Sequence, residues 1–597
     1  MAVKNYILVC GGTACESAGG GDIYKSLLSE AEAQGVAEDV QIVKTGCFGF
    51  CEKGPIVKVL PEQAFYVEVK PEDSKEIIAE TIVKGRIIDR LQYKSDQGAK
   101  GEAFDIENIE FYQKQYRIVL RNCGLIDPEK IDEYIARDGY AALEKCLFEM
   151  KPEGIIDELK IAGLRGRGGA GFPTWMKWNF TKQVQDEQKY VVCNADEGDP
   201  GAYMDRSTLE GDPHSVLEAM TIAAYCVGAN KGAIYIRAEY PLAIERLETA
   251  MKQAREYGLL GDDILGSGFN FDLEVRLGAG AFVCGEETAL LASIEGNRGM
   301  PTPKPPFPAV KGMFQKPTVI NNVETFANIP VIINKGGEWF SKIGTEKSKG
   351  TKVFALTGKI KNSGLVEVPM GTTLREIVFD VGGGIPSGKK FKAAQTGGPS
   401  GGVITEKDLD TPIDFDNLIA IGSMMGSGGL IVMDEDDCIV DVTKFYLDFS
   451  VEESCGKCAP CRIGTKKLYE YLDKITKGKG EMEDLEKMKD IGSAMKKASL
   501  CGLGQTAPNP ILSTIENFYE EYREHIEDGK CRAGKCKDLV HYEIIADKCI
   551  GCTVCARKCP VNCISGERKK PHVIDQDKCI KCGACYEGCK FDAITVS

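Results

Sequence analysis

The chain has 597 residues, of which 43% are hydrophobic and 27% are charged, and its formal net charge is −15 at pH 7. This length exceeds what one hydrophobic core organises and predicts about four domains, and the negative charge argues against nucleic acid and membrane as partners. The N-terminus lacks the apolar run of a signal peptide, and the longest apolar stretch, 418–433, contains four glycines and is too short to span a bilayer. We therefore expect a cytoplasmic protein.

The 25 cysteines are the most informative residues of the chain. In a reducing compartment, metal sites are a more common use of cysteine than disulfides. Four cysteines lie between positions 10 and 51, four between 455 and 501, and eleven after position 530. The other six stand alone and are expected to be small buried residues: Cys123, Cys146, Cys193, Cys226, Cys284 and Cys438.

The first cysteine group follows predicted strands near the N-terminus. Residues 6–9, 40–43 and 56–60 are apolar runs typical of strands, and 22–35 has the spacing of an amphipathic helix. The pairs C-x4-C and C-x3-C then lie on loops at strand ends. This spacing resembles the thioredoxin-like [2Fe–2S] ferredoxins, and the resemblance implies one [2Fe–2S] cluster on Cys10, Cys15, Cys47 and Cys51. Disulfide exchange is a poor alternative because a redox C-x-x-C motif is absent.

A glycine-rich segment, GLRGRGGAGFPTWMKWNF at 163–180, contains the pattern G-x-G-x-x-G at Gly166, Gly168 and Gly171. It is a weak Rossmann fingerprint, because 155–162 before it has the pattern of a helix and not of a strand. A phosphate-binding loop typically combines exposed backbone N–H groups, positive charge and a helix that begins at a proline. Here the positive charge comes from Arg165, Arg167 and Lys177, and the proline is Pro173. A merely flexible glycine loop is the alternative.

Carboxylates, amides and aromatic residues follow in four further segments. Residues 191–201 have the pattern of a strand that ends in a polar turn, and 278–288 is a glycine-rich approach to paired carboxylates. Residues 303–308 form a stiff proline-rich segment with one cation and one aromatic residue, and 321–325 supply amides. Amides and carboxylates suit ribose hydroxyls and ring edges, and aromatic residues suit stacking on nicotinamide or flavin.

The motifs GRGGAGFPT-x2-KW, NADEG-x-PG, CGEETAL, KPPFPA and NNVET occur in this order. Together they resemble the flavin-bearing NADH-dehydrogenase subunit of respiratory complex I and its relatives, over about 110–525. The resemblance implies an FMN site at Gly166, Gly168, Lys177, Asn194, Asp196, Glu197, Glu286, Asn321 and Asn322. It implies a nicotinamide-nucleotide site at Phe172, Phe180, Asp199, Glu287, Lys304 and Phe307, with Glu197, Lys177 and Glu287 as the catalytic residues.

One position departs from the complex I pattern. Where that pattern has Glu, this chain has the shorter Asp199. The family's carboxylate is thought to repel the 2′-phosphate of NADP, so the choice between NAD and NADP stays open.

Two further regions follow the flavin domain. Residues 353–360 and 365–368 alternate like a hairpin and 373–381 has the pattern of a short helix, which resembles the family's small β-grasp domain. Three cysteines two residues apart with a distant fourth then give [4Fe–4S] spacing, whereas zinc more often uses two separated pairs. The expected ligands are Cys455, Cys458, Cys461 and Cys501. The charged helical pattern of 466–497 predicts a helical bundle around this cluster.

The C-terminal segment repeats a ferredoxin motif, C-x2-C-x2-C-x3-C. In such two-cluster units the fourth cysteine of each run binds the other cluster. Cluster one is therefore expected on Cys549, Cys552, Cys555 and Cys589. Cluster two is expected on Cys579, Cys582, Cys585 and Cys559.

Three cysteines are then left, Cys531, Cys536 and Cys563. With His572 they would complete a closed tetrahedral zinc site that fixes the linker to the ferredoxin domain, and His541 is the competing fourth ligand. Three idle or buried thiols are the alternative. A fifth iron–sulfur cluster is disfavoured, because only three cysteines remain and their spacing is not typical of a cluster.

The predicted fold is multidomain, with α/β and α+β parts. Its parts are a thioredoxin-like [2Fe–2S] ferredoxin domain at 1–95, an FMN- and NAD-binding α/β domain at 100–345, a β-grasp domain at 346–437, a helical-bundle [4Fe–4S] domain at 438–529, and a zinc linker with a two-cluster ferredoxin domain at 530–597.

The assembled cofactors predict electron transfer. A hydride carries two electrons, a cluster accepts one, and a flavin between them can take two and release them singly. The flavin subunit of complex I lacks both terminal ferredoxin-like additions, and their fusion here resembles the flavin (beta) subunit of multimeric, electron-bifurcating [FeFe]-hydrogenases. The resemblance implies a diaphorase that couples NAD(H) and soluble ferredoxin to hydrogen chemistry. It also implies a hydrogenase-type catalytic subunit and a small thioredoxin-like [2Fe–2S] subunit as partners.

Three alternatives stay open. The diaphorase subunits of an NAD(P)-dependent formate dehydrogenase and of a non-bifurcating NADP-reducing hydrogenase share these modules. A non-catalytic electron-transfer scaffold that has lost its flavin belongs to another class. The complete glycine loop, Lys177 and the Glu286–Glu287 pair argue against the scaffold.

Overall fold

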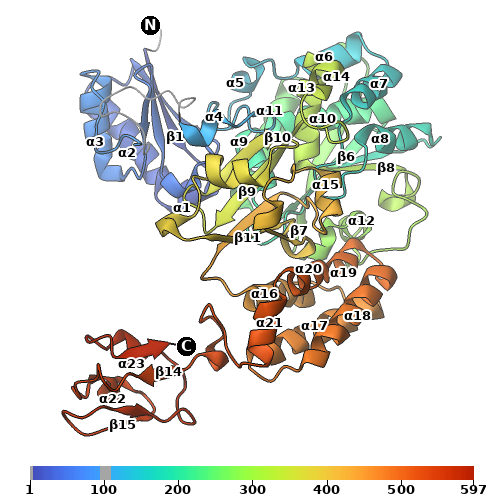
Figure 1. Cartoon of the computed structure of the whole chain (residues 1–597). Coiled ribbons are helices and arrows are strands. Elements are labelled where there is room, and N and C mark those ends of the chain that lie inside the picture. Colours follow the sequence, from blue (N-terminus) through green and yellow to red (C-terminus); the bar gives the residue numbers. More distant parts are fainter. Residues whose placement is uncertain (1–3, 95–108, 597) are drawn as a thin grey trace. The chain divides into compact units, whose positions relative to one another are not determined.

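The computed structural model describes residues 4–94 and 109–596. The predicted domain limits at 95 and 100 lie outside the described residues. The chain divides into two compact units (Figure 1): the first comprises Met1–Lys389 and Ala393–Val432, and the second comprises Lys390–Lys392 and Met433–Ser597. Among the described residues, none of the helices has the length and apolar character needed to cross a membrane.

The first unit begins with a four-stranded sheet in the order β2-β1-β3-β4. β1 (Asn5–Cys10) runs parallel to β2 (Val40–Thr45) and antiparallel to β3 (Val57–Leu60), which pairs with β4 (Ala64–Tyr66). The helix α2 (Gly20–Ala33) turns its apolar face, including Ile23, Leu27 and Ala31, into the core. The three predicted strands and the predicted helix are thus confirmed, within a few residues at their ends.

The central sheet of the first unit is parallel, in the order β7-β6-β5-β8. Its strands are β5 (Tyr190–Ala195), β6 (Lys231–Arg237), β7 (Asp272–Gly278) and β8 (Thr318–Asn322). The β5–β8 register pairs Asn194 with Asn322. Because both strands run in the same direction, their polar carboxyl ends meet at one edge of the sheet, where ligands of open α/β sheets bind.

Helices cover this sheet and hold the glycine loop, which we define as residues 163–173. The loop joins α7 (Pro152–Ala162) to α8 (Thr174–Gln183), so a helix precedes it, as predicted, and not a strand. α10 (Pro213–Val227) is buried along nearly its whole length and packs against α13 (Val323–Lys335) and β5.

A second, five-stranded sheet has the order β10-β9-β13-β11-β12. β9 (Thr351–Gly358) and β10 (Gly364–Pro369) form the predicted antiparallel hairpin. The predicted helix at 373–381 is present as a wider π-type helix over Glu376–Val381. The other strands are β11 (Phe391–Thr396), β12 (Val403–Thr405) and β13 (Gly429–Asp434).

The second unit contains a helical part followed by a small two-fold repeat. The helical part consists of α16 (Ile439–Glu452), α17 (Ala459–Thr476), α18 (Met482–Ala498), α19 (Gly502–Thr506), α20 (Asn509–Asn517) and α21 (Tyr519–Ile526). In the repeat, β14 (Tyr542–Ile544) pairs with β17 (Ile594–Val596), β15 (Ile564–Ser565) pairs with β16 (Val573–Ile574), and the short helices are α22 (Val554–Lys558) and α23 (Ala584–Glu587).

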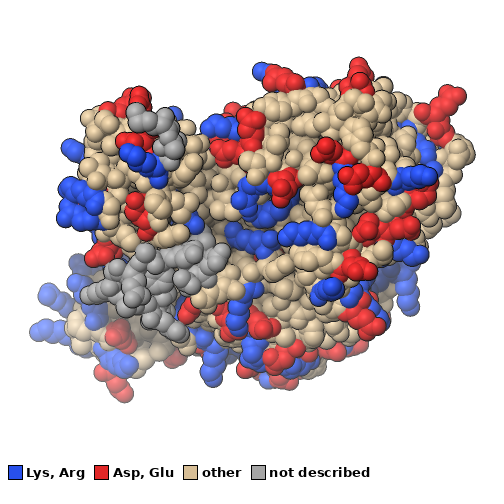
Figure 2. All heavy atoms as spheres, turned by 90° about the horizontal axis from the view of Figure 1, so that it is seen from above, with Lys and Arg blue, Asp and Glu red and all other residues tan. Residues whose placement is uncertain are grey.

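Charged side chains of both signs are interspersed over most of the face shown in Figure 2. The net charge of −15 is therefore not gathered into one acidic field on this face.

Candidate functional site

A cavity of about 780 Å³ in the first unit lies between the glycine loop and the carboxyl ends of β5 and β8. This volume is within the range of small-molecule sites, about 300–1,000 Å³. Of the residues predicted to bind FMN, those lining the cavity are Gly166, Gly168, Lys177, Asn194, Glu286, Asn321 and Asn322. Of those predicted to bind the nicotinamide nucleotide, the lining includes Phe172, Phe180, Glu287, Lys304 and Phe307. The predicted residues outside this lining are Asp196, Glu197 and Asp199.

The glycine loop has a fixed conformation. The Gly166 N–H donates to the Phe172 carbonyl over 2.9 Å, which closes the loop. At Gly168 the backbone passes so close to Asn322 that an added Cβ would lie 3.1 Å from the Asn322 Cβ. These contacts argue against a merely flexible loop and leave its backbone facing the cavity.

Only one of the three cations near the loop faces the cavity. Arg167 is fully buried, and its guanidinium donates to the carbonyl oxygens of Arg165, Lys349 and Thr351. Arg165 pairs with Asp416 over 2.8 Å. Burial lowers the pKa of Arg167 to about 10. The two arginines therefore hold the loop in place, which corrects the expectation that they add positive charge for a phosphate. Of these three cations, Lys177 is the one that lines the cavity.

Lys177 belongs to a chain of alternating charges along the cavity wall. Its Nζ donates to the Ile320 carbonyl over 3.0 Å and lies 3.4 Å from Glu287 Oε2. Lys304 Nζ lies 2.8 Å from Glu287 Oε1 and 2.9 Å from Glu286 Oε1. Burial alone would raise the pKa of Glu287, but the two lysines outweigh it and hold that pKa below its ordinary value. Glu287 is therefore an ionised carboxylate within the cavity.

Amides and a helix cap fix the edges of the cavity. Asn194 Nδ2 donates to the Gly285 carbonyl over 2.9 Å, and Trp178 Nε1 donates to Asn321 Oδ1 over 2.8 Å. Glu286 caps α12 (Glu287–Ile294), accepting the backbone N–H groups of its first turn. These bonds orient the side chains before any ligand is present.

Glu197 is buried and Asp199 is half-buried, and neither lines the cavity. Glu197 accepts the backbone N–H groups of Asp205 (3.0 Å) and Arg206 (3.1 Å) at the start of α9 (Met204–Gly211), and burial raises its pKa to about 7. Asp199 accepts a hydrogen bond from the Ser427 hydroxyl, and burial raises its pKa to about 6. Glu197 thus holds a backbone turn, and its predicted catalytic role stays a prediction.

Three phenylalanines at the cavity are unusually exposed for large apolar side chains. Phe172 and Phe180 are each 44% exposed, and Phe307 is 56% exposed. Exposed aromatic rings beside a cavity are typical of binding sites. Together with the glycine backbone, the amides and Lys177, these residues fit a flat heteroaromatic ring that carries a phosphate, as FMN does.

The predicted [2Fe–2S] ligands lie together in the N-terminal part of the first unit. Hydrogen bonding with Cys15 raises the pKa of Cys10, and hydrogen bonding with Cys10 raises that of Cys47. The Cys47 and Cys51 sulfurs are 4.0 Å apart, and the Tyr203 hydroxyl lies 3.8 Å from the Cys51 sulfur. Three of the four thiols are buried, so the site can shield a cluster from water.

The [4Fe–4S] ligands predicted in the helical part surround the start of α17. Cys455 and Cys458 precede this helix, Cys461 is in its first turn, and Cys501 precedes α19. Burial, and then the charge of the other three thiols, raises the pKa of Cys461 to about 11. The other three thiols are therefore near enough to Cys461 for their charges to act on it.

The C-terminal repeat contains two small apolar cavities, each with four expected cluster ligands. The first is lined by Cys549, Cys552, Cys555 and Cys589, together with His572. The second is lined by Cys559, Cys579, Cys582 and Cys585, together with Cys563. The fourth cysteine of each run thus lies in the other run's cavity, the arrangement that the sequence pattern predicts.

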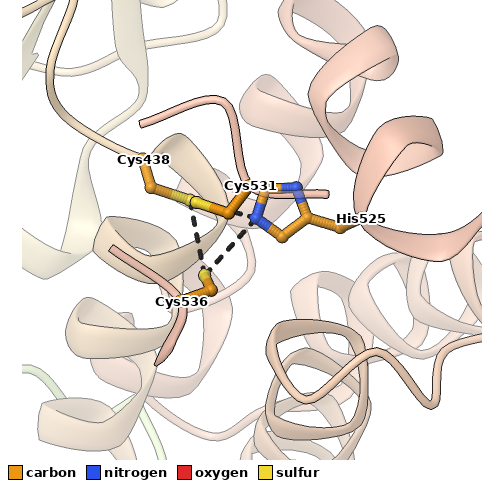
Figure 3. Close-up of side chains that lie close together, drawn as sticks. All are labelled: Cys438, His525, Cys531 and Cys536. Atoms are coloured by element: carbon orange, nitrogen blue, oxygen red, sulfur yellow. Dashed lines mark hydrogen bonds between the residues drawn. The ribbon is translucent and has the colours of Figure 1, made fainter. Parts of the chain in front are cut away.

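A further set of metal-ligand side chains is buried in the second unit (Figure 3). The ligand atoms of Cys438, His525, Cys531 and Cys536 all lie within 4.8 Å of one another. Cys438 Sγ is 3.3 Å from His525 Nε2 and 3.7 Å from Cys536 Sγ, and Cys536 Sγ is 3.4 Å from that nitrogen. His525 Nδ1 lies 2.6 Å from the Glu521 carbonyl, which leaves Nε2 free to bind a metal. Hydrogen bonds from Cys438 and Cys536 lower the pKa of Cys531, which favours a thiolate.

This geometry corrects the predicted zinc ligands. Cys531 and Cys536 are brought together, but Cys563 lies 3.4 Å from the Cys559 sulfur in the second ferredoxin cavity, and His572 lines the first one. His541, the competing ligand, is exposed and outside the set. The other two members of the set are His525 and Cys438, and the isolation of Cys438 in the sequence predicts only a buried core residue. The spacing H-x5-C-x4-C from His525 to Cys536 could have indicated the histidine.

Four family descriptions match the chain. They are "Nuo51 FMN-binding domain" at 159–331, "NADH-ubiquinone oxidoreductase-F iron-sulfur binding region" at 441–525, "4Fe-4S binding domain" at 542–565 and 572–595, and "Thioredoxin-like [2Fe-2S] ferredoxin" at 2–82. These matches confirm the predicted fold class.

Similar proteins include subunits of hydrogenases and of NADH dehydrogenases. The chain is 62% identical over 482 residues to the NADP-reducing hydrogenase subunit HndC of Solidesulfovibrio fructosivorans, covering 81% of this chain and 98% of the relative. It is 45% identical to an NADH-quinone oxidoreductase subunit of Rhizobium meliloti (strain 1021), covering 69% of this chain and 98% of the relative. A crystal structure of an NAD+-reducing [NiFe]-hydrogenase in the H2-reduced state matches with a TM-score of 0.62 and 29% identity. The match covers 88% of this chain and 85% of the chain in that structure.

Proposed function

Because the chain belongs to the family of complex I 51 kDa-type flavin subunits, we propose that it oxidises NADH or NADPH as the diaphorase subunit of a multimeric hydrogenase. In this function it passes electrons between NAD(P)H and a separate hydrogenase-type catalytic subunit. The observation that carries the proposal is the cavity of about 780 Å³, whose wall combines the glycine loop, Lys177 and the Glu286–Glu287 pair, in a chain with four cysteine sets for clusters.

The residues of the cavity suit both ligands. FMN, when bound, would take up the two electrons of a hydride and release them one at a time to the clusters. Backbone N–H groups of the glycine loop and the Lys177 ammonium would hold its phosphate, and the Asn194 and Asn321 amides would orient its ring. The exposed rings of Phe172 and Phe307 would hold the nicotinamide nucleotide and keep water from the reacting face.

The cluster ligands support a count of one [2Fe–2S] and three [4Fe–4S] clusters, which requires about fourteen irons per chain. The 62% identity to a subunit of an NADP-reducing hydrogenase supports a hydrogenase partner over a formate dehydrogenase partner. A small thioredoxin-like [2Fe–2S] subunit is the second partner that we propose.

We also propose that soluble ferredoxin exchanges electrons with the C-terminal repeat, as electron bifurcation would require. Residues 541–597 carry nine basic and seven acidic residues, whereas the whole chain is strongly acidic. Apolar side chains next to the cluster cysteines are exposed, among them Ile550 and Ile580. A small excess of positive charge and exposed apolar side chains beside two clusters suit an acidic electron carrier.

Isolation of the native complex tests the hydrogenase proposal. The tagged chain should co-purify with a subunit that evolves or consumes H2, and the complex should reduce NAD or NADP with H2. A complex that contains a formate-oxidising subunit instead would contradict it. Omitting ferredoxin from the assay distinguishes electron bifurcation from simple diaphorase activity. A bifurcating enzyme needs both acceptors at once, whereas a simple diaphorase needs the nucleotide alone.

For the buried set in Figure 3 we propose a structural zinc ion on Cys438, His525, Cys531 and Cys536. Tetrahedral zinc with bonds of about 2.3 Å to sulfur separates two ligand sulfurs by about 3.8 Å, and the two sulfurs of Cys438 and Cys536 are 3.7 Å apart. Atoms within 4.8 Å of one another leave room for one ion but not for a cluster's own sulfides. Zinc would tie the start of α16 to the linker that follows α21.

A further inference from the structure

The start of α9 connects the flavin-binding domain to the [2Fe–2S] site. Tyr203 immediately precedes this helix, and its hydroxyl donates to the Cys51 sulfur over 3.8 Å, although 152 residues separate the two in the chain. Glu197 accepts the backbone N–H groups of Asp205 and Arg206 and so holds the turn next to Tyr203. The phenol therefore reaches the sulfur from a backbone that its own domain keeps in place.

The end of α9 holds the helix that carries another cysteine of the site. The buried Glu210 side chain accepts the backbone N–H of Thr13 over 3.1 Å and also accepts the Thr13 hydroxyl. Thr13 is the first residue of α1 (Thr13–Ser17), and α1 contains Cys15. One helix of the flavin-binding domain thus makes hydrogen bonds to the segments of both cysteine pairs.

The loop that carries Cys51 is fixed by further backbone bonds. The Leu365 N–H donates to the Gly49 carbonyl over 2.7 Å, and the Glu52 N–H donates to the Ser363 carbonyl over 3.2 Å. Because these bonds lie on both sides of Cys51 in the chain, they hold its sulfur beside the phenol.

The space around the cysteines suits a cluster. A Cβ added at Gly12 would lie 3.3 Å from the Cys47 sulfur, and one added at Gly54 would lie 2.8 Å from the Cys15 sulfur. Glycine at both positions therefore leaves room beside the sulfurs. The Gly49 N–H donates to the Cys47 sulfur over 3.3 Å, so the protein already supplies one hydrogen bond to a ligand sulfur.

Given the [2Fe–2S] cluster of the proposed function, we propose that Tyr203 donates a hydrogen bond to the Cys51 ligand and raises the reduction potential of this cluster. A thiolate bound to iron has no proton, so it can only accept, and the phenol is the donor. The ordinary pKa of tyrosine is about 10, and burial raises that of Tyr203 further, so the hydroxyl keeps its proton. Reduction adds negative charge to the cluster and its ligand sulfurs, and a hydrogen bond to a sulfur stabilises this more negative form.

Tyr203 acts in this proposal as a positioning residue and not as a cluster ligand. The donor belongs to the flavin-binding domain, whereas the cluster belongs to the N-terminal domain. Docking of the N-terminal domain on α9 would therefore make its cluster a better electron acceptor than the same domain alone.

A redox titration of the full-length, cluster-loaded chain, followed by electron paramagnetic resonance, tests this role. Dithionite supplies the electrons, so the result does not depend on nucleotide oxidation. The signal that disappears in Cys10→Ala identifies the [2Fe–2S] cluster. Tyr203→Phe should lower the potential of that cluster and leave the iron content and the other clusters unchanged. Tyr112→Phe is the matched control and should leave the potential unchanged, because the Tyr112 hydroxyl donates to the Phe48 carbonyl of the same loop over 3.0 Å.

A second replacement keeps the shape of the side chain. A ring-fluorinated tyrosine incorporated in place of Tyr203 is a stronger donor, because fluorine withdraws electron density from the hydroxyl, and it should raise the potential. If Tyr203→Phe fails to assemble its cluster, the fluorinated protein decides between the outcomes.

An unchanged [2Fe–2S] potential in the fluorinated protein, or in Tyr203→Phe with all its iron, would overturn the role of Tyr203 and leave the proposed function intact. Unmodified protein that assembles its other clusters but has no [2Fe–2S] signal would overturn the cluster assignment, and the role of Tyr203 with it.

Discussion

Cys438 Sγ lies 3.3 Å from His525 Nε2, although 87 residues separate them in the chain. The contact joins the residue before α16 to the last turn of α21, and Cys536 completes a triangle with both. A ligand set with this geometry would close around one ion and would connect the helical part to the linker before the ferredoxin repeat.

The zinc proposal predicts a selective loss of metal. Cys438→Ala should lower zinc from about one per chain to near zero, while iron stays near fourteen per chain. Cys563→Ala is the matched control and should keep its zinc, because Cys563 lies among the cluster cysteines. Elemental analysis of the purified variants measures both metals. Zinc that survives Cys438→Ala and disappears in Cys563→Ala would contradict the assignment.

Removing the Lys177 ammonium should weaken the binding of FMN in the cavity. Lys177→Met removes the contact with Glu287 and the bond to the Ile320 carbonyl, and charge-assisted bonds contribute about 1.5–3 kcal/mol. We expect NADH–dye activity to fall about tenfold or more, with loss of bound FMN, measured by kinetics and flavin extraction. Lys182→Met on the same helix removes only a surface contact with Glu153 and should change neither. Equal effects of the two substitutions would indicate a general loss of helix stability.

Asp199 should make nucleotide preference depend on pH. Burial raises its pKa to about 6, so the carboxyl is ionised at neutral pH and becomes neutral as the pH falls through that value. Loss of the negative charge removes repulsion from a 2′-phosphate. The ratio of NADPH to NADH activity should therefore rise a few-fold from about pH 8 to about pH 5.

The Asn variant separates this effect from titration of the substrate. The 2′-phosphate itself titrates near pH 6, so part of any pH effect belongs to NADPH. In Asp199→Asn the ratio should be higher at neutral pH and should vary less with pH than in the unmodified protein. An identical pH profile in both proteins would show that Asp199 does not sense the 2′-phosphate.

The fifth cysteine of the first ferredoxin run should be able to replace a ligand. Cys563 Sγ lies 3.4 Å from Cys559 Sγ and lines the same cavity. Cys559→Ala should therefore retain much of cluster two, with iron near fourteen per chain, whereas Cys559→Ala with Cys563→Ala should fall to about ten. Iron analysis and the intensity of the cluster two signal measure this. Equal iron loss in the single and double variants would rule out the replacement.

Local patterns predict most of the fold, because they depend on residues close in sequence. The helix at 155–162, the glycine loop after it and the hairpin around 361–364 follow from periodicity and turn residues, and the structure contains them. The exchange of Cys559 and Cys589 between the ferredoxin cavities follows from the spacing of a known repeat.

The errors concern contacts between residues far apart in sequence. Arg167 lies in a loop suited to phosphate, yet its guanidinium turns to carbonyls near residue 350, which no local pattern indicates. Cys438 has no cysteine neighbour in sequence, so only the packing of α16 against α21 shows its partners. Proximity along the chain suggests zinc for His572, whereas the strands of the repeat place it at a cluster cavity.

In the function that we propose, electrons of NAD(P)H enter at the flavin cavity and pass to clusters of the same chain. Electron paramagnetic resonance of the anaerobic, FMN-loaded protein, frozen after addition of NADH or NADPH, tests it most directly. We predict the signal of at least one reduced cluster, and its absence when FMN is removed or Lys177 is replaced by Met. Clusters that dithionite reduces but that neither nucleotide reduces, in protein with its full FMN and iron, would contradict this electron path.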